Sequence, residues 1–226
     1  MRALALEREP SALIFDLDST LYTNKEYAAF QEEVLVERLG RELGLGPGGA
    51  EARIASLRAQ RAAAGQGRTS LGTLFAALGV DIATSVRWRE ECIDPGRWLS
   101  RDERLDRALS LLEREFRLAL VTNNPRLVGR KSLQALGVDV RFEIIVGLDD
   151  TMSSKPSPRP FEEAARRLEL QPALCASIGD RADVDLAPAM SLGMGALLVD
   201  GVEDVYALPS FLAGRFGKPL AETANP

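Results

Sequence analysis

The sequence predicts an α/β protein in which a doubly wound parallel sheet carries an all-helical domain inserted after its first strand. Two observations support this prediction. From residue 98 onward, short apolar runs of strand length alternate with helical patterns, which is typical of a parallel sheet covered on both faces. Residues 22–97 follow the first apolar run and show helical patterns without a strand signal. We therefore expect an α/β core formed by residues 1–21 and 98–226, and a helical cap domain at residues 22–97.

The core has five expected strands, at residues 12–15, 117–122, 142–146, 174–178 and 196–199. Its helices are expected at about 103–115, 124–136, 158–168 and 183–192, with a short last helix at 209–216. Ser100 to Glu103 forms a capping-box pattern before the first of these helices. Asn124 and Pro125 supply an N-cap and an N1 proline for the second. The predicted core is thus Rossmann-like.

Four helices are expected between residues 22 and 97. Thr23 to Glu26 is a capping-box pattern that opens the first helix, which extends to about residue 43. Glycine-rich breaks separate it from an Ala- and Arg-rich helix at 50–64. Thr69 or Ser70 is expected to cap a third helix through Leu78, and a fourth covers about 84–92.

The composition of the 226 residues excludes several classes of protein. The net charge is −5 and the Lys and Arg residues are spread along the chain, so we expect no nucleic-acid partner. Neither a signal-peptide pattern nor an apolar run of membrane-spanning length occurs, and we expect a soluble, cytoplasmic protein. With no His and two Cys, His-dependent catalysis and zinc sites built on His or four Cys are excluded. We expect Cys92 and Cys175 to be buried thiols.

Two aspartates, Asp16 and Asp18, come directly after the strand at 12–15. Ligands of open α/β sheets bind at the carboxyl ends of the strands, where these two side chains are expected to lie. Two neighbouring carboxylates repel each other, and a divalent cation is the natural way to offset that repulsion. The alternative is an Asp-rich turn whose carboxylates are solvated.

Three further polar groups follow other expected strands or loops, namely Thr122 with Asn123, Lys155, and Asp180 with Asp185. In a parallel sheet all of them converge on the same edge as Asp16. Carboxylates, a hydroxyl, an ammonium group and a helix start together suit a phosphate bound with Mg²⁺. Taken alone, each of these groups has an ordinary structural alternative to a binding role, because a strand-ending Thr, a solvated loop Lys and a Gly-Asp turn are common.

In order and spacing, these motifs resemble those of the haloacid dehalogenase-like hydrolase superfamily. The matching pieces are Asp16-Leu-Asp-Ser-Thr20, Val121-Thr-Asn123, Ser154-Lys155-Pro156, and Asp180 with Asp185. The resemblance implies that Asp16 is the nucleophile that forms an aspartyl-phosphate. It implies that Asp18 protonates the leaving oxygen and then deprotonates water. Since the dehalogenases of the superfamily lack this second Asp, the chain resembles the phosphatases.

The resemblance also implies the remaining roles. Mg²⁺ would be held by the Asp16 side chain, the Asp18 carbonyl and Asp180. Thr122, the Asn123 amide and Lys155 would bind the transferring phosphoryl group. Asp185 would orient Lys155 or a metal-bound water. Arg181 departs from the small residue usual at its position, and we expect it to pair with Asp183.

The helical block resembles the first type of cap in this superfamily, which contacts the leaving group. A weaker resemblance links residues 15–22 and 66–72 to the pyrimidine 5′-nucleotidase-like branch. Tyr22, Asn24, Arg68 and Thr69 are therefore predicted leaving-group contacts, and the alternative for each is an ordinary surface or helix-capping residue.

The function expected from these motifs is Mg²⁺-dependent hydrolysis of a small soluble phosphomonoester, either a nucleoside monophosphate or a sugar phosphate. Two alternatives are a phosphotransferase or mutase on the same fold, and a non-catalytic binding or regulatory member. Retention of Asp16, Asp18 and Lys155 argues against the last. The sequence does not specify an oligomeric state.

Overall fold

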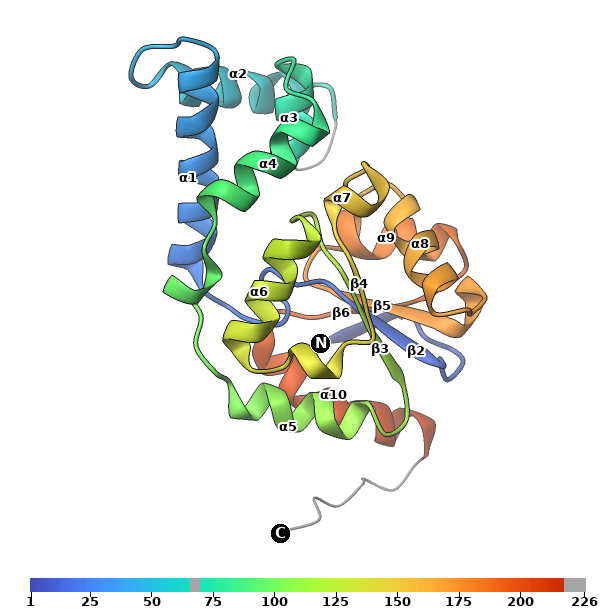
Figure 1. Cartoon of the computed structure of the whole chain (residues 1–226). Helices are drawn as coiled ribbons and strands as arrows, with labels where there is room; N and C mark the ends of the chain where they lie inside the picture. The colour runs from blue at the N-terminus through green and yellow to red at the C-terminus, as the bar shows by residue number, and fades with distance from the viewer. Residues whose placement is uncertain (66–69, 218–226) are drawn as a thin grey trace.

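The protein has a six-stranded sheet whose strand order is β1-β6-β5-β2-β3-β4 (Figure 1). The computed structural model describes residues 1–65 and 70–217. The strands are β1 (Arg2–Ala5), β2 (Ala12–Phe15), β3 (Arg117–Val121), β4 (Ile144–Val146), β5 (Cys175–Gly179) and β6 (Gly195–Leu198). Strands β2 to β6 pair in parallel, and β1 pairs antiparallel with β6 at the edge. The five predicted strands are confirmed.

Helices cover both faces of this sheet, as a doubly wound fold requires (Figure 1). All four residues of β2 are buried, and alternate residues point to opposite faces. On one face, Leu13 and Phe15 pack with α5 (Glu103–Leu112), α6 (Arg126–Leu136) and α10 (Val202–Phe216). On the other, Ala12 and Ile14 pack with α8 (Arg159–Arg167) and α9 (Ala187–Ser191). This arrangement places β2, with Asp16 at its end, in the middle of the sheet.

Residues 22–97, which lie between β2 and α5, form what we call the helical segment. It contains α1 (Lys25–Glu42), α2 (Gly49–Ala63), α3 (Leu71–Ala77) and α4 (Ile82–Cys92), followed by the short turn η1 (Pro95–Arg97). Figure 1 shows α1 leading away from the sheet, α2 and α3 at the far end, and α4 returning toward it. The four helices agree with the prediction, and the described part of the segment contains no strand.

Several predicted helix starts were wrong. Asn24, not Thr23, caps α1, because its side chain accepts the Tyr27 N–H. Asp102, not Ser100, caps α5 by accepting two N–H groups of the first turn. For α6 the N-cap position is occupied by Pro125 rather than Asn124, whose side chain is engaged elsewhere. At α1 and α5 a neighbouring residue has the geometry to accept the free N–H groups, and at α6 the Arg126 N–H donates to Asp149 Oδ1 at 2.6 Å. A sequence pattern specifies neither arrangement.

Four other elements differ from the prediction. The edge strand β1 was missed because its residues, only four and alternately exposed, carry no buried run. The short helix α7 (Leu148–Thr151) was not expected. The helix at 183–192 is divided into a π-helical turn η4 (Ala182–Leu186) and α9. The last helix starts at Val202, not at Pro209, which lies inside it. The other short helical turns are η2 (Asp139–Arg141) and η3 (Pro172–Leu174).

Both cysteines are free thiols, as predicted. Cys175 is buried in β5, and burial raises its pKa to about 11. Cys92, at the end of α4, is only partly buried, so the prediction that it is buried was wrong. Over residues 1–65 and 70–217, none of the helices combines the length and apolar character that crossing a membrane requires.

Candidate active site

Asp16, Thr122 and Asp180 lie at the carboxyl ends of β2, β3 and β5, which are neighbours in the sheet, and Lys155 lies in the loop between α7 and α8. Asp16 follows β2 directly, and its N–H donates to Ile178 O of β5 at 2.8 Å. The chain then turns sharply, with Ser19 in the left-handed region at φ 63°. This turn brings Thr20 back so that its hydroxyl donates to Asp16 Oδ2 at 3.3 Å. The Asp-rich loop is therefore a folded structure around Asp16.

Lys155 lies at the centre of the site and is almost completely buried, with 2% of its surface exposed. Its Nζ donates to Asp16 Oδ1, to Asp185 Oδ1 at 2.7 Å and to Val121 O at 3.1 Å. All three hydrogens of the ammonium group therefore have partners. Burial alone would lower the pKa of Lys155, but the combined attraction of Asp16 and Asp185 outweighs it, so the net pKa is raised.

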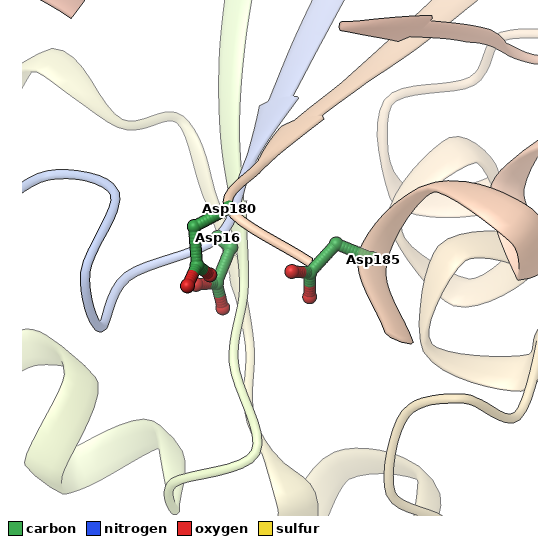
Figure 2. A group of neighbouring side chains, drawn as sticks. All are labelled: Asp16, Asp180 and Asp185. Carbon is green, nitrogen blue, oxygen red and sulfur yellow. The ribbon is translucent and has the colours of Figure 1, made fainter. Parts of the chain in front are cut away.

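Three aspartates surround one point beside this lysine. Oxygens of Asp16, Asp180 and Asp185 all lie within 4.8 Å of one another. Figure 2 shows the Asp16 and Asp180 carboxylates side by side, with Asp185 pointing toward them from the helical turn η4 after β5. Asp185 is fixed in place because its Oδ2 accepts the Arg181 N–H at 3.1 Å. Its backbone oxygen accepts a hydrogen bond from Ser177 Oγ at 2.9 Å.

The charges of this cluster are not balanced within the protein. Burial raises the pKa of Asp16 to about 8, with Lys155 opposing the rise and the Asp185 and Asp18 carboxylates adding to it. Burial, followed by the charge of Asp185, also raises the pKa of Asp180 to about 6. One lysine therefore does not compensate these carboxylates, and a bound cation would. Hard carboxylate oxygens at this spacing are the ligands that Mg²⁺ prefers, so the residues fit the predicted metal.

Thr122 and Asn123 follow β3 and lie next to the lysine loop. Thr122 is buried, and its Oγ1 accepts the N–H of Asn124 at 3.1 Å. The Asn123 side chain binds the backbone of Lys155 at both ends, accepting its N–H at 2.7 Å and donating to its carbonyl at 3.2 Å. Asn123 thus fixes the position of Lys155, a role that sequence reasoning did not assign to its side chain.

Asp18 is surrounded by hydrogen-bond donors. Its Oδ1 accepts from the Tyr22 hydroxyl and from Gln31 Nε2 at 2.9 Å, and its Oδ2 accepts from Asn124 Nδ2 at 3.1 Å. Asn124 Nδ2 also donates to Gln31 Oε1 at 3.1 Å. Burial, followed by the charge of Asp18, raises the pKa of Tyr22 well above its ordinary value. The Tyr22 hydroxyl therefore remains a proton donor.

Arg89 of α4 completes this group. Its Nη1 donates to Asn124 Oδ1 at 3.1 Å, and only 8% of the residue is exposed. Burial lowers the pKa of Arg89 to about 10, opposed by the charge of Asp18.

Sequence reasoning missed Gln31, Arg89 and the true partners of Asn124. A usable signal existed: Gln31 lies one turn from Tyr27 and from Leu35, on the buried side of α1, where a polar residue is unexpected.

The predicted leaving-group contacts have different surroundings. Tyr22 is bound to Asp18, as described above. Asn24 has both polar ends occupied, since it caps α1 and donates to Trp98 O at 3.0 Å, so the structure favours the helix-capping alternative. Arg68 and Thr69 lie outside the described residues, and Ser70 caps α3. Arg181 pairs with Asp183 at 3.3 Å, as predicted.

A family model of the haloacid dehalogenase-like hydrolases matches residues 10–193. The chain belongs to this family. The haloacid dehalogenase-like fold is also seen in the crystal structure of a HAD phosphatase from Thermococcus onnurineus. That structure is 23% identical and aligns with a TM-score of 0.59 over 90% of this chain and 98% of the other.

Curated relatives match over shorter stretches. The phosphoglycolate phosphatase of Colwellia psychrerythraea is 39% identical over 72 residues, which is 32% of each chain. The pyrophosphatase PpaX of Halalkalibacterium halodurans is 38% identical over 71 residues, or 31% of this chain and 33% of the other. The chain thus spans about a third of the length of these haloacid dehalogenase-like relatives.

Proposed function

We propose that this chain is a Mg²⁺-dependent phosphatase that hydrolyses a small soluble phosphomonoester through an aspartyl-phosphate on Asp16. The observation that carries the proposal is the cluster of Asp16, Asp180 and Asp185 around the buried ammonium of Lys155. The cluster carries more negative charge than Lys155 alone neutralises, which suits a bound cation. It also places a lysine beside the proposed nucleophile. The curated relatives above are named as a phosphoglycolate phosphatase and a pyrophosphatase, which agrees with a small phosphorylated substrate.

In the proposed reaction, a carboxylate oxygen of Asp16 attacks phosphorus in line with the leaving oxygen. The bond between phosphorus and the leaving oxygen breaks, and Asp18 gives that oxygen a proton. Water then attacks the phosphorus of the aspartyl-phosphate while Asp18 removes its proton, which releases phosphate and restores Asp16. Lys155, Thr122 and the Asn123 N–H bind the phosphoryl oxygens on which charge develops.

Asp16, Asp180 and the Asp18 carbonyl would hold Mg²⁺, whose positive charge keeps the carboxylates ionised and polarises the phosphoryl group. Asp185 acts through Lys155, to which it is hydrogen bonded at 2.7 Å. The helical segment is proposed as a cap domain over residues 22–97, since α1 and α4 both reach the Asp18 side of the site. It would exclude water and contact the leaving group.

Phosphate release tests this function. The wild-type protein with Mg²⁺ is expected to hydrolyse p-nitrophenyl phosphate and members of a panel of nucleoside monophosphates, sugar phosphates and phosphorylated hydroxy acids. Asp16→Asn is expected to abolish turnover while keeping the fold, because the change is near-isosteric. Undiminished phosphate release by this variant would exclude the covalent mechanism. A mutase would release little phosphate and require a bisphosphate primer.

A further inference from the structure

Asp18 is held from two directions at once. Asn124 approaches it from the loop after β3, and Gln31 approaches from α1 of the helical segment, at 3.1 Å and 2.9 Å. Together with the Tyr22 hydroxyl, these donors occupy both carboxylate oxygens. A side chain with fixed donors on each oxygen has little rotational freedom about its χ angles. The position of the Asp18 carboxylate is thus set by donors from its own loop, from α1 and from the loop after β3.

The amide of Asn124 has only one orientation that satisfies its neighbours. Arg89 has donors and no acceptor, so the group facing its Nη1 must be the carbonyl oxygen of Asn124. The NH₂ end is then directed at Asp18 Oδ2 and Gln31 Oε1, both of which accept hydrogen bonds. Without Arg89, the Asn124 carbonyl oxygen would lose its donor, and only the contacts of the NH₂ group with Asp18 and Gln31 would hold the amide in this orientation. Arg89 therefore orients Asn124, and Asn124 orients Asp18.

The charge of Arg89 also supports its link to Asp18 through Asn124. The guanidinium is buried, and among the described residues no carboxylate lies within ion-pair distance of it. Burying an unpaired cation is costly. Asp18 is joined to Arg89 through one intervening side chain, and that carboxylate offsets the cost. Arg89 belongs to α4 and Gln31 to α1, whereas Asp18 and Asn124 belong to the core. This hydrogen-bond network therefore joins the helical segment to the core.

We propose that Arg89, Gln31 and Asn124 are positioning residues that place the Asp18 carboxyl group for proton transfer, and that they do so only while the helical segment is packed against the core. The proposal rests on the phosphatase function above. When the phosphorus–oxygen bond breaks, its electron pair stays on the leaving oxygen, which takes the proton from Asp18. When water forms the new phosphorus–oxygen bond, its proton goes to Asp18. Both transfers need the same carboxyl group within hydrogen-bond reach of the reacting oxygen.

The test compares substrates that differ in their need for an acid. The leaving group of p-nitrophenyl phosphate departs readily without a proton, whereas an alkyl phosphate requires one. We expect Arg89→Met and Gln31→Leu to lower kcat/KM for alkyl phosphates by about tenfold to a hundredfold, as misplaced catalytic groups do. The value for p-nitrophenyl phosphate is expected to fall by less than about threefold, because acid catalysis contributes little to it. Arg89→Lys, which keeps a donor to Asn124 Oδ1, is expected to recover part of the loss.

Matched controls come from exposed positions of the same residue types. Arg87→Met lies on the exposed side of α4 and Gln134→Leu on the exposed side of α6, and both are expected to retain wild-type rates on both substrates. In an Asp18→Asn background, Arg89→Met is expected to cause no further loss on alkyl phosphates, since the group it positions is already absent. Equal losses on both substrates, or a full additional loss in that background, would overturn the proposal.

A crystal structure of the Arg89→Met variant separates this proposal from the proposed function. We expect the Asn124 amide or the Asp18 carboxylate to leave its place in that structure. If both stay where they are, the positioning role is refuted, whatever the activity. If the wild-type protein releases no phosphate from any substrate, the proposed function fails, while the crystal structure still decides whether Arg89 and Asn124 fix Asp18. If Arg89→Met does not fold, Arg89→Lys and Gln31→Leu take its place in both experiments.

Discussion

Replacing Asp180 by Asn should stabilise the metal-free protein while it destroys the proposed metal site. The pKa of Asp180 is raised from 3.8 to about 6, first by burial and then by the charge of Asp185. A carboxyl group with a raised pKa in the folded state binds protons more tightly there, so stability falls as pH rises between the two values. A shift of about two units corresponds to about 3 kcal/mol. Since the side chain is only partly buried, solvent screening reduces this to about 1–2 kcal/mol.

Thermal unfolding in a chelating buffer measures this effect. At pH 8 the Asp180→Asn variant should melt above the wild type by about 2–8 °C, given about 2–4 °C per kcal/mol for a chain of this size. At pH 4 most of the difference should vanish, because Asp180 is then largely protonated in the folded wild type. Adding Mg²⁺ should raise the melting temperature of the wild type and have little effect on the variant.

Asp200→Asn is the matched control, as its side chain is 91% exposed and should show neither effect. A variant less stable than the wild type at pH 8, or equally stabilised by Mg²⁺, would refute the view that this cluster is short of positive charge.

Two further substitutions test the same site. Lys155→Met should destabilise the protein by about 3–5 kcal/mol, because it leaves the Asp16 and Asp185 carboxylates buried without their ammonium partner. Urea unfolding at pH 7 measures this loss, and a value below about 1 kcal/mol would contradict the prediction. Gly179→Ala places a Cβ 2.5 Å from the Asp185 Cβ, so it should cost about 1–3 kcal/mol and displace Asp185, with a loss of activity. Its control is Gly214→Ala in α10, where no atom beyond the helix's own backbone and the adjoining residues lies within 4 Å of the added carbon and a gain of about 0.5–1 kcal/mol is expected.

The sheet could be predicted because its strands are buried on both faces. Each of the five parallel strands appears in the sequence as an apolar run, and the polar residues that follow β2, β3 and β5 mark the edge where ligands bind in open α/β sheets. For the same reason Asp16, Thr122 and Asp180 could be placed together without coordinates. The edge strand β1 lacks such a run, since one side of it has no neighbouring strand and its residues are partly exposed.

The environment of Asp18 could not be predicted, for a different reason. The network around Asp18 forms only after the helical segment folds back onto the core. Asn124 is 35 residues from Arg89 and 93 from Gln31, and no local sequence period connects residues so far apart. Asn124 also matched a helix-capping pattern, which offered a local role that the structure does not use. Local patterns locate helices and strand ends, whereas side-chain networks between helices depend on tertiary packing.

The junctions of the helical segment lie side by side. Asn24, just before α1, donates to the carbonyl of Trp98, just after the segment, so the chain leaves the core and re-enters it at the same place. A segment attached in this way can be exchanged for another during evolution without altering the strand order or the cluster of Asp16, Lys155 and Asp180. The hydrogen bonds of Gln31 and Arg89 restrict that freedom. A replacement segment must bring its own donors to Asp18 and Asn124, so new substrate preferences would be acquired most readily at positions of α2 and α3, away from that contact.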